Sequence, residues 1–197
     1  MTLNPITEQR QFLVACGQDS PENSGLYNAL IQEEWNAETL PAARINNRVA
    51  VFDGLLDTVY VLAGRANTLF DHTRDNIESF IPTHELASVS ETAAWAMTMC
   101  EVEAAKAEME PWKVVFRCVR AAEYVWALGL RLGYPMEAGW LEVHASNMAK
   151  VDKETGKVIR REDGKILKPE GWVGPNLEAI LAGESGNYLD KLAVEAA

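Results

Sequence analysis

The stretch "VFDGLLDTVY", residues 51–60, places two acidic residues in a segment that is otherwise almost entirely apolar. Asp53 and Asp57 are four residues apart, which is about one turn of an α-helix, so both point from the same helix face. Burying two like charges side by side costs free energy unless a cation joins them. The stretch therefore predicts a buried helix that carries a carboxylate pair in need of a partner.

The sequence on either side of this stretch predicts further helices. Apolar residues extend the central helix over about 45–69 and cover most of its circumference, which is typical of an enclosed helix. A preceding helix is expected over about 26–40, with Pro41 as its break. The short segment "PAARINN", 41–47, would then fold the two helices into an antiparallel hairpin. More helices are expected over about 85–109, over about 112–132 and from Met136 onward, with one or two helical turns in "PNLEAILAG".

The organisation predicted from this pattern is an all-α bundle of four to five helices over residues 1–143, followed by a basic C-terminal extension over 144–197. The segment "KETGKVIRREDGKILKPEGW", 153–172, has two glycine-centred turn signals and predicts a hairpin or an ordered flap. Its positive charge contrasts with the acidic remainder of the chain. The basic residues are Lys153, Lys157, Arg160, Arg161, Lys165 and Lys168.

Residues 31–66 and 98–133 share a layout. Each has a glutamate-containing helix, a proline break and an apolar helix with an acidic residue before an aromatic–apolar run. In the second copy the acidic residues are Glu101, Glu103 and Glu123. Two interpretations remain open: an internal tandem duplication, or amphipathic helices that simply resemble each other.

Composition limits the classes of function. The 197 residues suit one domain or a domain with an appendage, and the net charge of −11 argues against a general nucleic-acid or anionic-membrane binder. The three widely spaced cysteines indicate neither a disulfide framework nor a zinc site, so a reducing cytoplasm is the expected compartment. The apolar runs are interrupted by charges, and we therefore expect no membrane span.

The informative feature is a constellation of carboxylates. The first helix offers Glu33, Glu34 and Glu38, and Glu34 shares a face with Glu38 for the same one-turn reason as the aspartates. In a hairpin, both pairs would converge into an oxygen-rich cage, which hard divalent ions such as Mg²⁺ or Mn²⁺ prefer. Such a cage can hold a polyphosphate and activate a water.

The residues also allow plainer interpretations of these acids. Glutamates on a helix usually form a solvated face, and Glu33 and Glu34 taken alone favour that interpretation. The aspartates are also consistent with capping, with a cavity, or with ion pairs to Arg44 or Arg48.

Two parts of the chain resemble a known family. "EEW…E" followed by "DGLLDTVYVLAG" resembles the all-α nucleoside triphosphate pyrophosphohydrolases of the MazG type, which include the dimeric dUTPases and phosphoribosyl-ATP pyrophosphohydrolase. "EVHASNMAK" followed by "REDGKILKPEGW" is similar to the C-terminal segment of phage and bacterial MazG-like proteins. The family signature is Glu-Glu-x-x-Glu on one helix and Glu-x-x-Asp on the next. Here the third glutamate falls at Ala37, one residue before Glu38, and the fourth acid falls at Gly54, one residue after Asp53.

The resemblance implies a function and a set of site residues. The expected activity is metal-dependent hydrolysis of a nucleoside or deoxynucleoside triphosphate, such as the purine nucleotide dGTP, to the monophosphate and pyrophosphate. Alternatives are a pyrimidine-specific hydrolase like the dUTPases, a nucleotide-binding protein without turnover, and an assembly module. Family habit implies a dimer or tetramer. Glu34, Glu38, Asp53 and Asp57 would hold Mg²⁺, Glu33 or Glu34 would activate water, and Trp35, Tyr60, Asn147 and Lys150 would contact substrate.

Overall fold

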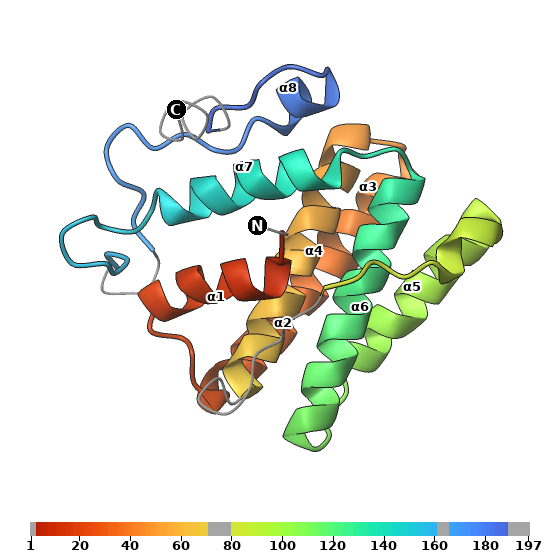
Figure 1. The fold of residues 1–197 in the computed structure, drawn as a ribbon, viewed down its shortest axis with the longest axis horizontal. Coiled ribbons are helices and arrows are strands. Elements are labelled where there is room, and N and C mark those ends of the chain that lie inside the picture. The colour runs from red at the N-terminus through yellow and green to blue at the C-terminus, as the bar shows by residue number, and fades with distance from the viewer. Residues whose placement is uncertain (1–2, 71–79, 161–165, 189–197) are drawn as a thin grey trace.

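The computed structural model describes residues 3–70, 80–160 and 166–188, and within these ranges the regular structure is helical (Figure 1). The all-α class is therefore confirmed for the described residues. Two isolated antiparallel bridges, Val151–Val158 and Arg160–Ile166, lie where the tail hairpin was predicted. Residues 161–165 of that prediction, including Arg161 and Lys165, and residues 71–79 of the connection before the third predicted helix lie outside the described residues. The longer helices are α1 (Pro5–Ala15), α2 (Ser24–Ile31), α4 (Arg48–Leu69), α5 (Glu91–Ala105), α6 (Pro111–Arg131) and α7 (Met136–Met148).

The helix that carries the aspartate pair, α4, is the centre of the fold. It packs against α6, α1, α2 and the helical segment that follows α2. Phe52, Leu55 and Leu56 are fully buried, and the same holds for Val59 and most of the next two turns. A helix that is apolar on nearly all sides needs neighbours on nearly all sides, which is the arrangement predicted for 45–69.

The predicted break at Pro41 is wrong. After α2 the chain continues as a π-helix, η2 (Gln32–Thr39), and then as α3 (Leu40–Arg44), so helical structure runs through the proline. A π-helix bonds i to i+5 and has wider turns than an α-helix. Pro41 stands in the first turn of α3, where the hydrogen-bonding pattern changes and a missing N–H is tolerated.

The true break between the two helices is residues 45–47. Asn46 has φ of 55°, a left-handed conformation that asparagine tolerates better than most residues. Asn47 then caps α4, because its side-chain oxygen accepts a hydrogen bond from the N–H of Ala50 at 3.2 Å. The hairpin predicted from "PAARINN" is therefore present, with its turn at the end of that segment.

A second helical pair, α5 and α6, packs beside α4 (Figure 1). A short 3-10 turn, η3 (Glu85–Ser88), precedes α5, and Pro111 opens α6 as its first residue. The predicted helix over 85–109 ends earlier, at Ala105. The carbonyl of Ala105 accepts a hydrogen bond from Arg65 in α4 at 2.6 Å, which gives it a partner outside its own helix.

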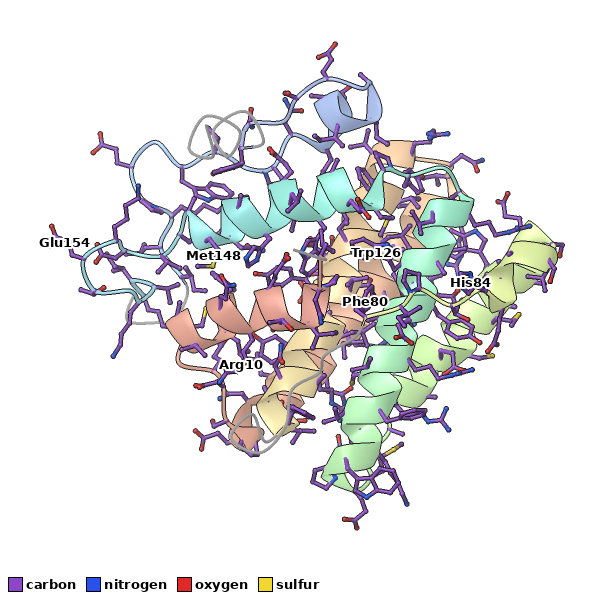
Figure 2. The ribbon with its side chains drawn as sticks, in the orientation of Figure 1. Arg10, Phe80, His84, Trp126, Met148 and Glu154 are labelled. Carbon is purple, nitrogen blue, oxygen red and sulfur yellow. The ribbon has the colours of Figure 1, made fainter. Side chains whose placement is uncertain are left out.

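Helix α7 and the C-terminal segment cover one end of this bundle (Figure 1). Figure 2 shows side chains filling the spaces between the helices; Phe80 and Trp126, for example, meet edge to face with ring centroids 5.5 Å apart. The boundary expected between residues 143 and 144 falls inside α7, and the last helix is the short α8 (Leu177–Leu181). Among the described residues, no helix has the length and apolar character needed to cross a membrane.

The N-terminal helix α1 was not among the predicted elements. Asn4 caps it by accepting hydrogen bonds from the N–H groups of Ile6 and Thr7, and Pro5 is its first residue. The cap and the proline are ordinary signals for a helix start, but the polar residues that follow them mask the apolar periodicity. Its buried face packs against α4 and α7.

Candidate functional site

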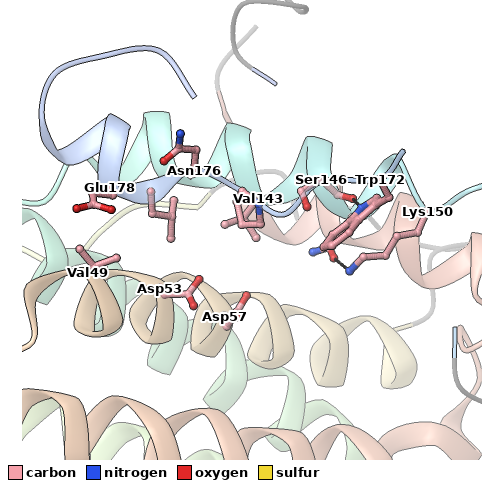
Figure 3. Close-up of a pocket in the computed structure, with 12 residues that line it drawn as sticks. Val49, Asp53, Asp57, Val143, Ser146, Lys150, Trp172, Asn176 and Glu178 are labelled. Carbon is pink, nitrogen blue, oxygen red and sulfur yellow. Dashed lines mark hydrogen bonds between the residues drawn. The ribbon is translucent and has the colours of Figure 1, made fainter. Parts of the chain in front are cut away.

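A cavity of about 440 Å³ lies between α4, α7 and the C-terminal segment, and Asp53 and Asp57 form part of its wall (Figure 3). Across from the aspartates stand residues of α7, and the remaining wall comes from the segment just before and within α8. The site therefore combines residues of α4 with two parts of the chain that follow about 90 and 120 residues later in sequence. The lining residues are Val49, Asp53, Asp57, Val143, Ser146, Asn147, Lys150, Trp172, Pro175, Asn176, Leu177 and Glu178.

Neither aspartate has a hydrogen bond or ion pair with any other residue in the described part of the chain. Arg48, one candidate partner, instead places its guanidinium 5.4 Å from the ring centroid of Tyr134, and Arg44 is exposed without an ion pair. The interpretation of the aspartates as partners of these arginines is therefore not supported. Both aspartates are only partly exposed and line the cavity, where the charge of Lys150 acts on Asp57 without forming an ion pair with it.

Burial is the largest cause of the raised pKa of both aspartates. For Asp57 the negative charges of Asp53 and Glu34 raise the pKa further, while the positive charge of Lys150 lowers it in part. For Asp53 the second cause is Glu38. These mutual effects show that carboxylates of η2 and α4 lie close enough to repel one another.

Glu34 is the carboxylate of η2 that is most affected by this environment. Burial, then the charges of Glu38, Glu33 and Asp53, raise its pKa from 4.5 to about 7. Glu33 and Glu38 are exposed, and none of the three glutamates of η2 lines the cavity wall itself. The predicted glutamate set thus lies next to the aspartate pair, on the η2 side of α4.

The contact between η2 and α4 explains why glycine occupies position 54. A Cβ at this position would lie 2.3 Å from Oγ1 of Thr39 and 3.1 Å from its Cα, so only glycine fits. The Thr39 hydroxyl in turn donates a hydrogen bond to the carbonyl of Glu34 at 2.7 Å. Position 54 therefore faces the helix crossing, and the acid expected there by resemblance is carried by Asp53, which faces the cavity.

Lys150 and Asn147 bring hydrogen-bond donors and a positive charge to the same cavity. The Lys150 ammonium donates to Oδ1 of Asn147 at 2.7 Å and lies 5.2 Å from the ring centroid of Trp172. Burial lowers the pKa of Lys150, and the charge of Asp57 opposes that shift. The wall thus offers acidic groups on α4 and a cation at the end of α7 (Figure 3).

Two predicted substrate contacts do not reach the cavity. Trp35 is fully buried and packs against Trp95 with centroids 6.0 Å apart, so its ring offers no free face for a base. Tyr60 is 7% exposed and lies in an aromatic cluster with Phe12 and Trp140. His144 stacks on Trp140 in the same cluster, and its burial lowers its pKa to about 4.

The acidic residues of the second helical pair are committed to other partners. Glu101 lies 3.0 Å from Arg120, Glu103 lies 2.7 Å from Lys106, and Glu123 accepts a hydrogen bond from the N–H of Ile81 at 3.2 Å. Partnered carboxylates are poor candidates for a cation site, because each already has a compensating donor. Of the two segments with a similar layout, residues 31–66 are therefore the one whose acidic residues are available to bind a cation.

Several lining residues were not predicted as site residues. Ser146 lies between the motif residues of α7, and Trp172, Asn176 and Glu178 come from the C-terminal segment. The sequence signals for Ser146 and Trp172 were the motifs "EVHASNMAK" and "KPEGW" that carry the resemblance, whereas Asn176 and Glu178 had none, because a wall built by a distant loop has no periodicity of its own.

The donor chemistry of the site suits a hard divalent ion, since the side chains that gather here are carboxylates without cationic partners. Within residues 3–70, 80–160 and 166–188, however, no three Asp, Glu, His or Cys side chains are already arranged to hold one ion. Comparison with family models, curated proteins and solved structures gave no match to this chain.

Proposed function

We propose that this chain is a metal-dependent pyrophosphohydrolase that converts a nucleoside or deoxynucleoside triphosphate and water to the monophosphate and pyrophosphate. The observation that carries the proposal is the pairing of two unpartnered aspartates with Lys150 and Asn147 across one cavity. A site for a metal-bound polyphosphate needs acidic groups for the metal and basic or N–H groups for the phosphates, side by side. The resemblance to MazG-type enzymes supports the same assignment.

In this proposal, residues of α4 and η2 bind the metal ion, and Asn147 and Lys150, at the end of α7, bind the phosphates. Asp53 and Asp57, with Glu34 and Glu38, hold Mg²⁺ or Mn²⁺; a bound ion lowers the pKa of water and neutralises phosphate charge. Lys150 provides a point charge for the phosphates, and Asn147 provides an amide donor.

Water activation falls to Glu33 or Glu34. With a pKa of about 7, Glu34 can accept a proton near neutral pH, which is the range in which a general base is most effective.

We further propose that the substrate is a deoxynucleotide of the cellular or phage pool, with a purine such as dGTP as the first candidate and a pyrimidine nucleotide like that of the dUTPases as the alternative. Because Trp35 and Tyr60 are enclosed, base contacts fall to the C-terminal wall instead. We also propose a dimer or tetramer. Trp112 and Phe116, one turn apart on α6, are 67% and 58% exposed and offer an apolar surface for self-association.

The test is a panel of NTPs and dNTPs with Mg²⁺ or Mn²⁺, in which pyrophosphate and orthophosphate are measured separately. We expect pyrophosphate as the first product and no turnover with a chelator present. Orthophosphate as the first product, or no turnover with any nucleotide, contradicts the proposed activity.

A second candidate is a nucleotide-binding protein without turnover. It is favoured by the lack, among the described residues, of three carboxylates already placed around one point. Calorimetry separates the two: binding of a Mg²⁺–triphosphate with no release of pyrophosphate supports the second candidate, and release of pyrophosphate excludes it.

A further inference from the structure

The C-terminal segment from Trp172 to Tyr188, here named the roof, closes the cavity opposite the aspartates (Figure 3). Trp172, Asn176 and Glu178 are the polar or aromatic residues that it contributes. Apart from α8 the roof has no regular structure, so its own backbone bonds do not fix its position. Something outside the roof must hold it over the site.

Glu142 in α7 makes the contacts that do so. Its side chain is fully buried, and Oε1 accepts hydrogen bonds from the N–H groups of Asn176 at 3.1 Å and Asn187 at 2.6 Å. Oε2 accepts a third from the N–H of Tyr188 at 2.9 Å. Hydrogen bonds to an ionised carboxylate are stronger than neutral ones. One side chain thus joins both the part of the roof just before α8 and the end of the roof to α7.

The roof is shaped around this carboxylate. A Cβ at Gly186 would lie 2.4 Å from Cδ of Glu142, so the chain passes directly over the carboxylate with no room for a side chain. The two ends of the roof are also joined to each other: the Tyr188 hydroxyl donates to the carbonyl of Val173 at 2.7 Å, and the Asn187 amide donates to that of Gly174 at 2.9 Å.

The anchored roof also determines what surrounds Lys150. The indole N–H of Trp172 donates to the carbonyl of Ser146 at 2.9 Å, which fixes the ring beside α7. The ammonium groups of Lys150 and Lys168 lie 5.2 Å and 4.1 Å from the centroid of this ring. A cation over an aromatic face is attracted to it, so the position of the roof affects the position of the Lys150 charge in the cavity.

We propose that Glu142 is a positioning residue: it holds the roof over the cavity and so places Trp172 and the Lys150 ammonium for phosphate binding. The placement of Trp172 and Lys150 for phosphate binding rests on the proposed function, while the anchoring of the roof by Glu142 does not. Glu142 does not line the cavity, and its role is therefore to set the affinity for substrate and not to take part in the chemical step.

Three variants and a control test this role. Glu142→Ala removes both acceptor oxygens and with them the three hydrogen bonds to the roof, and Glu142→Gln keeps one carbonyl oxygen but turns an NH₂ group toward a backbone N–H. Gly186→Ala displaces the roof while leaving Glu142 and every residue that lines the cavity chemically unchanged. Gly25→Ala is the matched control, because a Cβ there meets nothing within 4 Å.

The first measurement is amide hydrogen exchange of peptides covering residues 172–188. We expect faster exchange in Glu142→Ala and Gly186→Ala, an intermediate rate in Glu142→Gln and the wild-type rate in Gly25→Ala. Wild-type exchange in both Glu142→Ala and Gly186→Ala overturns the anchoring. Hydrogen exchange needs no ligand. It therefore tests whether Glu142 anchors the roof even if the wild-type protein hydrolyses no nucleotide and the proposed function fails.

The second measurement is steady-state kinetics with dGTP and Mg²⁺, or with the best nucleotide of the panel. A misplaced binding group weakens substrate binding, and we expect KM to rise ~10-fold or more in Glu142→Ala and Gly186→Ala while kcat changes little. Faster exchange together with an unchanged KM overturns the positioning role. A fall in kcat at constant KM also overturns it, because it would place Glu142 in the chemical step.

Discussion

Asp57 lies on the most enclosed helix of the protein, one turn from a second aspartate and close to Glu34. Burial, and after it repulsion by Asp53 and Glu34, raises the pKa of Asp57 and favours its protonated form, while the charge of Lys150 acts in the opposite direction. Like charges held this close lower the stability of the folded protein, and a bound cation offsets their repulsion. The crowding at Asp57 is thus the residue-scale property from which the proposed function follows.

For Asp57→Asn we expect two opposite effects. If Asp57 holds the metal ion as proposed, its loss should lower the proposed activity ~100-fold or more, because even changes to residues that only support a metal ligand cost about 10- to 100-fold. Loss of a repelled charge should raise the melting temperature of the metal-free protein. Activity assays and calorimetry with a chelator measure both, with the exposed Asp19→Asn as control. A variant that keeps full activity would remove Asp57 from the site.

Glu34 predicts a pH dependence of stability. The folded protein keeps the Glu34 proton up to about pH 7, whereas the unfolded chain releases it near 4.5. Between these values the folded state binds more protons, so the free energy of unfolding falls as pH rises. Urea unfolding at pH 5, 6 and 7.5 without divalent ions should show this fall, and Glu34→Gln should show a smaller one. Equal slopes in the two proteins would contradict the shifted pKa.

At the scale of elements, the register between η2 and α4 decides which side chains reach the cavity. Thr39 and Gly54 meet where the two helices are closest, and this contact turns Asp53 and Asp57 toward α7.

Gly54→Ala should therefore destabilise the fold although alanine favours helices. Overpacking at a backbone contact costs roughly 1–3 kcal/mol, which exceeds the gain of about 1 kcal/mol from replacing a helical glycine. Chemical denaturation measures the difference. The same substitution at Gly25, which faces open space, should be neutral or slightly stabilising. If Gly54→Ala were as stable as Gly25→Ala, the two helices would not be in contact at Thr39.

Much of this element pattern follows from local sequence. The apolar circumference of α4, a helix over about 112–132 and the start of α7 at Met136 were all predicted, because each depends on residues close in the chain. The π-helix before Pro41 and the early end of α5 were not predicted. At the end of α5 the carbonyl of Ala105 bonds to Arg65 of another helix, a partner that local sequence does not reveal. In the site, periodicity indicated the aspartates, but nothing local indicated the wall formed by Trp172 and Asn176.

At the scale of the whole molecule, Arg65 joins the two helical pairs. It is fully buried in α4, and its guanidinium donates to the side chains of Ser24 and Asn28 in α2 and to the carbonyl of Ala105 at the end of α5. It also pairs with Glu108 at 2.9 Å, in the turn before α6. One side chain therefore connects both halves of the possible repeat.

Arg65→Met should be strongly destabilising, by roughly 3 kcal/mol, because it leaves buried oxygen acceptors without their donor. Denaturant unfolding tests this value. Glu108→Gln is the control: the Glu108 side chain is 82% exposed, so water replaces its partner and little stability is lost. An Arg65→Met protein as stable as the wild type would show that the two halves hold together without this connection.

The wide turns of η2 account for the difference in spacing between the acidic residues of this chain and the MazG-type signature that they resemble. A π-helical stretch accommodates one residue more than regular α-helix does over the same path. Deleting Ala37 alone would convert "EEWNAE" into Glu-Glu-Trp-Asn-Glu, the spacing of the MazG-type signature, and would let the stretch tighten into ordinary helix. A single codon thus separates the Glu-Glu-x-x-Glu spacing from that of Glu33, Glu34 and Glu38. The π-helix η2 accommodates the additional residue, so that the helices on either side of it can keep their positions.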